Sequence, residues 1–179
     1  MEKEIQMLTY RKTLGCLLAL TILVACQPVT SDRQLQVAER GAQVMPFDLD
    51  RTTHIFTKLD NGGLQQVLSD DGDTAQIELI REHLAEEADR FSKGDFHDPE
   101  MIHDADMAGL HELTMGAGRL NIVYSDTESG GQILYTTTDA DLVSALHAWF
   151  DQQVADHGNH ATMQSSAMSL PEVTTAESK

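Results

Sequence analysis

Two stretches of this chain carry the same order of apolar patterns, and that repeat constrains the fold more than any other feature of the sequence. In each stretch, two runs rich in β-branched and aromatic residues flank a Gly-Gly turn, and an amphipathic segment follows. The stretches cover residues 52–91 and 120–157. The corresponding turn and helix-capping residues are Gly62, Gly63 and Asp73 in the first stretch, and Gly130, Gly131 and Asp139 in the second.

The amphipathic segments predict one helix in each stretch, because their apolar residues recur at helical spacing. These residues are Ile77, Ile80, Leu84 and Ala88 in the first, and Val143, Leu146, Phe150 and Val154 in the second. On the first helix we place the acidic residues, Glu87 among them, on the side that faces water. Two copies are too few for a solenoid. We therefore expect an α+β domain over residues 46–157: a duplicated ββα–ββα unit with a four-stranded antiparallel sheet, two main helices on one face and a short helical connector over 92–119.

The N-terminal region has the pattern of an export signal. Basic residues precede an apolar run over 14–25, which is too short to span a bilayer stably. The end of that run, Leu23-Val24-Ala25-Cys26, resembles the bacterial lipobox. The resemblance implies a signal peptide over 1–25, acylation of Cys26 with palmitate-type chains, and a lipid anchor in the cell membrane or outer membrane that faces outside the cytoplasm. A plain signal peptide cut elsewhere and an uncleaved anchor are the alternatives.

Composition limits what the mature chain can do. With Cys16 removed and Cys26 acylated, no thiol remains for a disulfide, a thiolate metal site or a cysteine nucleophile. The formal net charge of −17 disfavours nucleic acid as a partner and favours cations or a basic protein, although it also serves solubility alone. The polar stretch 26–45 predicts a flexible tether, and the Ser/Thr/Ala-rich stretch 158–179 predicts a disordered tail.

Histidine and methionine are concentrated in the connector, at His97, Met101, His103, Met107, His111 and Met115. Thioethers and imidazoles suit Cu(I), whereas imidazoles with carboxylates suit Cu(II) or Zn(II). The candidate metal site, with copper as the candidate cofactor, consists of His54, His103, Met107 and His111. The alternative is ordinary packing, in which Met107 fills the core beside Leu110 and Leu113.

Two segments carry a resemblance to a known family. With MPFDLDRTTHIF at 45–56 and IHDADMAGL at 102–110, the chain resembles a small family of secreted prokaryotic proteins that has no established activity. Its members are often labelled aspartate carbamoyltransferase. True carbamoyltransferases have a Ser-Thr-Arg-Thr phosphate loop and a His-Pro-x-Gln motif. Residues 50–54 only faintly echo the first and the second is missing, so we reject that activity.

No nucleophile elbow, P-loop, zincin or dinucleotide fingerprint occurs in the sequence. We therefore expect a membrane-anchored extracytoplasmic binding or interaction lipoprotein rather than an enzyme. The alternative function is a small extracytoplasmic hydrolase or isomerase that uses His54 and His103 as acid/base groups.

Overall fold

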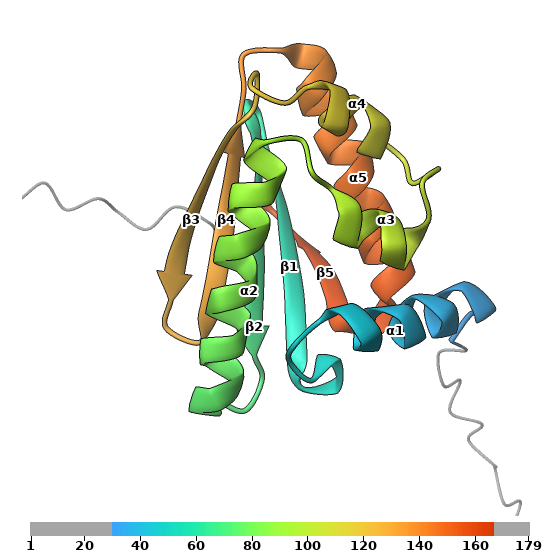
Figure 1. Ribbon diagram of the computed structural model, residues 1–179, viewed down its shortest axis with the longest axis vertical. Helices are drawn as coiled ribbons and strands as arrows, with labels where there is room; N and C mark the ends of the chain where they lie inside the picture. The colour runs from blue at the N-terminus through green and yellow to red at the C-terminus, as the bar shows by residue number, and fades with distance from the viewer. Residues whose placement is uncertain (1–29, 167–179) are drawn as a thin grey trace, which may run out of the picture.

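A computed structural model describes residues 30–166, which fold into a sheet packed against helices (Figure 1). In chain order the elements are α1 (Asp32–Val44), the 3₁₀ turn η1 (Leu49–Arg51), β1 (Thr52–Leu59), β2 (Gly62–Ser69), α2 (Thr74–Ser92), α3 (His97–His103), α4 (Leu110–Met115), β3 (Asn121–Thr127), β4 (Gly130–Thr136), α5 (Ala140–His157), the 3₁₀ turn η2 (Gly158–His160) and β5 (Ala161–Gln164). The α+β class is confirmed, and the order strand–strand–helix occurs at β1-β2-α2 and again at β3-β4-α5.

Within the described residues, five strands form one mixed sheet in the order β3-β4-β2-β1-β5. The first four are antiparallel, as expected. The fifth strand corrects the prediction, because β5 pairs in parallel with β1 and comes from the stretch predicted to be a disordered tail. Without β5, β1 would be an edge strand with unpaired backbone groups. Ala161 and Met163 of β5 also pack against the core. Pairing and packing together therefore form a strand that the local sequence does not predict.

Both main helices lie on one face of the sheet, where two glycines leave room for them. A Cβ atom on Gly63 of β2 would come within 2.4 Å of Phe150 on α5, and one on Gly131 of β4 would come within 3.1 Å of Leu84 on α2. These positions belong to the strands rather than to the turns. Their lack of a side chain lets each helix approach the sheet closely.

Aromatic side chains fill the space between the helices. Phe91 of α2 stacks on Phe96 with ring centroids 4.5 Å apart, and Trp149 of α5 meets both rings edge-on. Trp149 is 1% exposed. This cluster ties the start of the connector to both main helices, and so it fixes where α3 begins.

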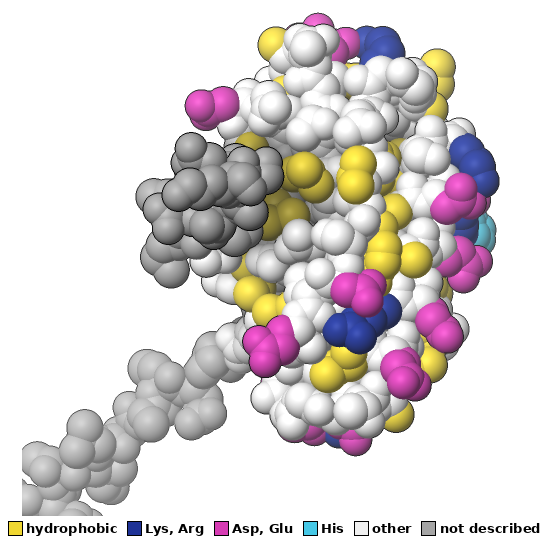
Figure 2. All heavy atoms as spheres, turned by 90° about the vertical axis from the view of Figure 1, so that its left-hand side faces the viewer, with side chains coloured by type: hydrophobic (Ala, Val, Ile, Leu, Met, Phe, Trp, Pro, Cys, Tyr) yellow, Lys and Arg dark blue, Asp and Glu magenta, His cyan; other side chains and the backbone are white. Residues whose placement is uncertain are grey.

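The opposite face of the sheet is not covered by any helix that the structure describes. Ile55, Leu64 and Leu134 lie on it half-buried, and Val123 on β3 is 47% exposed. Seen from the side of β3, apolar side chains lie among uncharged groups at the surface (Figure 2). No helix in the range 30–166 is both long and apolar enough to cross a membrane.

The predicted tether contains a helix instead. Ser31 caps α1 in a capping box: its hydroxyl accepts from the Gln34 backbone N–H, and the Gln34 side chain accepts from the Ser31 N–H. Five of the thirteen residues of α1 are apolar, but only Val37 and Gly41 are buried. The helix is held by polar contacts to distant segments, which no local pattern predicts. Cys26, the predicted signal 1–25 and the predicted tail beyond 166 lie outside the described residues.

The connector forms two short helices rather than a continuous His/Met stripe. The chain turns at Asp104 and Gly109, whose φ angles are 70° and 78°. A Cβ on Gly109 would lie 2.0 Å from the Ala145 carbonyl oxygen of α5. The close approach to α5 therefore requires glycine there.

Candidate metal centre

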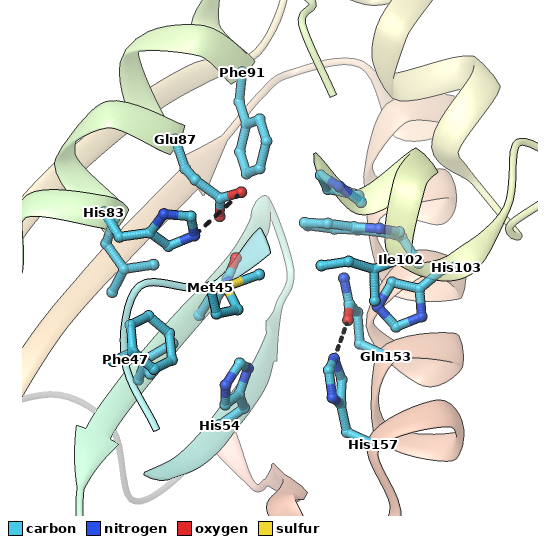
Figure 3. A pocket seen from close by; sticks show the side chains of 15 residues that line it. Met45, Phe47, His54, His83, Glu87, Phe91, Ile102, His103, Gln153 and His157 are labelled. Carbon is cyan, nitrogen blue, oxygen red and sulfur yellow. Dashed lines mark hydrogen bonds and ion pairs between the residues drawn. The ribbon is translucent and has the colours of Figure 1, made fainter. Parts of the chain in front are cut away.

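A small cavity of about 30 Å³ lies between β1, α2, α3 and α5 (Figure 3). Its volume suits an ion or a very small number of waters. Polar side chains line it together with apolar ones such as Phe47, Phe91 and Ile102. The main polar groups are His54, His83, Glu87, His103, Gln153 and His157.

Secondary structure explains why these side chains meet. His54 lies two positions from Thr52 and from Phe56 on β1, so all three side chains are on the same buried face of the strand. This face points toward the helices. His83 and Glu87 are one turn apart on the buried side of α2. This corrects the prediction for Glu87, which is 5% exposed and does not face water.

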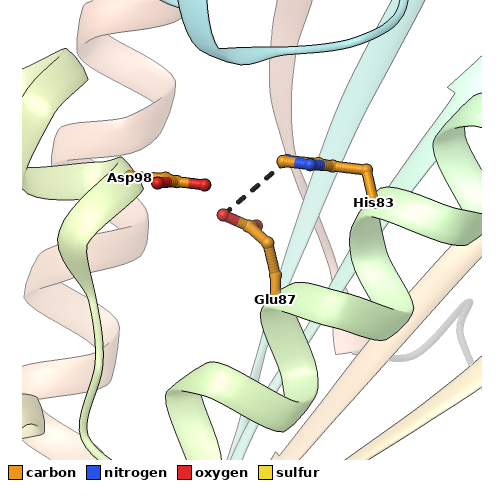
Figure 4. A group of neighbouring side chains, drawn as sticks. All are labelled: His83, Glu87 and Asp98. Atoms are coloured by element: carbon orange, nitrogen blue, oxygen red, sulfur yellow. Dashed lines mark ion pairs between the residues drawn. The ribbon is translucent and has the colours of Figure 1, made fainter.

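His83, Glu87 and Asp98 form the tightest group of potential metal ligands in the described chain (Figure 4). Each offers one ligand atom, and these atoms all lie within 4.8 Å of one another. His83 Nε2 is 3.7 Å from Glu87 Oε1. Asp98 comes from α3, and Arg90 donates to its Oδ2 at 2.8 Å. A second residue thus orients the carboxylate, as is usual for metal ligands.

Two atoms of this group lack an expected partner. His83 Nε2 and Glu87 Oε1 are buried, and neither forms a hydrogen bond within residues 30–166. Buried polar groups without a partner are rare and call for water or an ion. A cation between His83, Glu87 and Asp98 would satisfy both atoms at once.

Burial also shifts the protonation of these groups. Burial, reinforced by the nearby Asp98 charge, raises the pKa of Glu87 to about 8. Burial lowers the pKa of His83. In the metal-free protein at neutral pH, the pair is therefore a protonated carboxyl beside a neutral imidazole. A bound cation favours the carboxylate form.

A second set of imidazoles lies on the other side of the cavity. The ring centroids of His54 and His157 are 5.0 Å apart, as are those of His103 and His157. Burial lowers the pKa of His54 to about 4, and burial also lowers the pKa values of His103 and His157. All three rings are consequently neutral at pH 7.

Two of these three rings are fixed by hydrogen bonds. His103 Nδ1 lies 2.8 Å from Asp156 Oδ2, and His157 Nε2 lies 3.1 Å from Gln153 Oε1. Burial raises the pKa of Asp156, but hydrogen bonds from Arg33, His103 and Gln152 outweigh it, and the net pKa is below the ordinary value. Asp156 is therefore ionised and accepts from His103 Nδ1–H. His54 Nε2, by contrast, is buried and has no described partner.

The structure brings together part of the predicted copper site. His54 and His103 line the same cavity. Met107 does not: it is 5% exposed and packs in the hydrophobic core, to which Leu110 and Leu113 also belong. His111 is exposed on α4. The interpretation of Met107 as a core residue thus agrees with its place in the fold.

The sequence did not lead us to assign His83, Glu87, Asp98 or His157 as metal ligands. One signal for the first two was present, since a histidine followed by a glutamate four positions later lies on one side of a helix. That pair adjoins the apolar stripe at Ile80 and Leu84 and could have been assigned to the buried side. No comparable local signal exists for Asp98 and His157, which reach the cavity through the packing of α3 and α5.

Comparison of the chain with protein-family models, with curated proteins and with solved structures finds no match. The functional argument therefore rests on the site itself.

Proposed function

We propose that this domain binds one divalent transition-metal ion through His83, Glu87 and Asp98, with zinc as the first candidate. The observation that carries the proposal is the pair of buried donor atoms, His83 Nε2 and Glu87 Oε1, which have no described partner and lie beside a third ligand. Zinc binds histidine nitrogen and carboxylate oxygen at about 2.0–2.2 Å. Donor atoms as close as these need only small rotations to share one ion.

The donor chemistry favours zinc over Cu(I). One imidazole and two carboxylates are nitrogen and oxygen ligands, whereas Cu(I) prefers thioethers. Met107, the thioether of the predicted copper site, packs in the core. Copper binding through His54, His103, Met107 and His111 therefore requires movement of α4, and zinc binding at His83 does not.

The size of the cavity favours binding over catalysis. A volume of about 30 Å³ is far below the range of roughly 300–1,000 Å³ that is typical of small-molecule sites. His54 and His103 are 5% and 1% exposed. The alternative of an acid/base hydrolase or isomerase requires both imidazoles to reach a substrate, and His103 lines only this small cavity.

The membrane location is a proposal that rests on the N-terminal sequence. The apolar run 14–25 and the lipobox-like Leu23-Val24-Ala25-Cys26 support a lipid-anchored, extracytoplasmic protein. Intact-mass measurement of the membrane-extracted protein tests it, because acylation adds the mass of the acyl chains at Cys26. Cys26→Ser is expected to abolish that mass increase and to release the protein from the membrane fraction.

Calorimetric titration of the chelator-stripped full-length protein tests the metal proposal. Zinc is expected to bind one ion per chain. His83→Ala and Glu87→Gln are each expected to weaken binding by about tenfold or more, as for other metal ligands and their partners. Glu86→Gln, an exposed carboxylate next to Glu87, is the matched control and should leave binding unchanged.

Absence of stoichiometric zinc binding by the wild type would refute this site. Tighter binding of copper than of zinc, abolished by Met107→Leu and unaffected by His83→Ala, would instead establish the site predicted from the connector.

A further inference from the structure

A second and larger hollow adjoins the cavity on the side of α1. This groove of about 650 Å³ is bounded by α1, by the segment around η1 and by η2. Its volume lies within the range of small-molecule sites. Phe47, His54 and His157 line both hollows, so the groove leads to the buried imidazoles.

One wall of the groove is apolar. From α1 it receives Leu35, Val37, Ala38 and Ala42, and from the facing segment Phe47 and Leu49. Leu35 is 57% exposed, which is unusual for a large aliphatic side chain. An apolar body placed in the groove would bury it.

The other boundary of the groove is acidic. Asp48 and Asp50 are exposed at the rim, and the side chain of Asp50 is 91% exposed. Asp156 also lines the groove, but its charge is balanced by Arg33. None of the described residues that line the groove is Lys or Arg. Asp50 Oδ1 lies 3.8 Å from His160 Nε2, which also lines the groove. With two exposed carboxylates and no Lys or Arg among its described lining residues, the rim is acidic and attracts cations.

The inner end of the groove holds a polar atom that needs a partner. His54 is 5% exposed, and its Nε2 forms no hydrogen bond in the described chain. His157 lies beside it, with the ring centroids 5.0 Å apart (Figure 3). A ligand hydroxyl or amide that reached His54 would satisfy this atom.

We propose that this groove binds a small organic cation that has an apolar body and one further hydrogen-bonding group. The ammonium lies near Asp48 and Asp50, the apolar body lies between α1 and Phe47, and the hydrogen-bonding group reaches His54 Nε2. The proposed zinc ligands are not part of this site, so the two proposals are independent.

Tyramine is a suitable probe, because it combines an amine, a ring and a hydroxyl. Calorimetry or ligand-observed NMR with the full-length protein would compare it with two analogues. Phenethylamine lacks the hydroxyl, and 3-(4-hydroxyphenyl)propionate replaces the amine with a carboxylate. Tyramine is expected to bind about tenfold more tightly than the carboxylate, because the acidic rim repels an anion. Tyramine should also bind at least about threefold more tightly than phenethylamine, because phenethylamine cannot make the hydrogen bond to His54.

Variants assign the binding to the groove. Ala38→Trp fills the space beside α1 and should weaken tyramine binding at least about tenfold, while Gln36→Trp, exposed on the same helix outside the groove, should leave it unchanged. Asp48→Asn with Asp50→Asn should remove most of the preference for the amine over the carboxylate. His83→Ala should bind tyramine like the wild type, which separates this site from the metal centre.

Three outcomes would overturn the proposal. The first is equal binding of the amine and the carboxylate, the second is no effect of Ala38→Trp, and the third is no tyramine binding. Concentration-dependent dimerisation that Leu35→Asp abolishes would show that a second copy of the chain covers the groove instead.

Discussion

His103 and Asp156 are 53 positions apart in the sequence, yet His103 Nδ1 lies 2.8 Å from Asp156 Oδ2. Arg33 donates to the same oxygen at 2.9 Å and also contacts Asp104. Asp156 is 2% exposed. One buried carboxylate therefore joins α1, α3 and α5, and it lines the groove beside His157.

Loss of Arg33 should destabilise the protein. In Arg33→Ala the buried Asp156 carboxylate keeps His103 and Gln152 but loses its cationic partner. Because Arg33 is 35% exposed, we expect a loss of about 2 kcal/mol in the free energy of unfolding, less than for a fully buried pair. Urea denaturation measures it. Lys93→Ala, which breaks an exposed pair with Asp89, should change stability by less than about 1 kcal/mol.

The cap of α1 should control the order of that helix. Ser31→Ala removes the hydroxyl that accepts from the Gln34 N–H and should destabilise α1 by about 1 kcal/mol. Hydrogen exchange of the α1 amides is expected to accelerate while the amides of β1 and β2 keep their protection. Ser144→Ala, in the middle of α5, is the control. Unprotected α1 amides already in the wild type would contradict the helix and restore the flexible tether.

Acid should destabilise the protein through His54. Its pKa is lowered by burial from 6.5 to about 4, so the unfolded chain binds its proton more readily than the folded chain does. The contribution of His54 to the free energy of unfolding is fully present above pH 6.5 and is lost as the pH falls toward 4. At 1.36 kcal/mol per pKa unit, the loss is about 3 kcal/mol. His83, His103 and His157 have lowered pKa values and contribute with the same sign.

Denaturation at pH 7, 6, 5 and 4 measures this effect. His54→Asn should lose less stability over that range than the wild type does. His111→Asn, on the exposed side of α4, should behave like the wild type. Equal acid sensitivity of the wild type and His54→Asn would show that His54 is not the responsible group.

A side chain at Gly63 should displace α5. In Gly63→Ala the new methyl group would sit 2.4 Å from Phe150 Cε2, well inside van der Waals contact. Overpacking of this kind costs about 1–3 kcal/mol. Thermal unfolding measures the loss. The double variant Gly63→Ala, Phe150→Leu should recover part of it if the clash is the cause, and simple addition of the two losses would argue against that cause.

Metal should stabilise the fold. At a free zinc concentration about a hundredfold above the dissociation constant, the expected gain is about 2.7 kcal/mol. A chelator should reverse it. Glu87→Gln should gain at most about 1.4 kcal/mol at the same zinc concentration if its binding is about tenfold weaker, because glutamine keeps the size of Glu87 but cannot supply a carboxylate. An equal rise in melting temperature in both proteins would place the zinc elsewhere.

Local sequence patterns were sufficient to predict the first four strands and the two main helices. The runs rich in β-branched and aromatic residues, the Gly-Gly turns and the caps at Asp73 and Asp139 predicted β1 to β4, α2 and α5. They failed for α1 and β5. These two elements are held by partners far along the chain, Asp156 for α1 and β1 for β5.

The candidate site shows the same division. The abundance of histidine could be read directly, and His54 and His103 were singled out from it. Their meeting with His157, and that of His83 and Glu87 with Asp98, depends on how α2, α3 and α5 pack over the sheet.

The sequence by itself determined the α+β class and the repeated strand–strand–helix order, because periodicity, turns and caps act over a few neighbouring residues. Only the tertiary structure decided the fifth strand, the docked α1 and the meeting of His83, Glu87 and Asp98. Those features are contacts between segments distant in sequence, and their free energy comes from burial and from pairing of charges that become neighbours only in the folded chain.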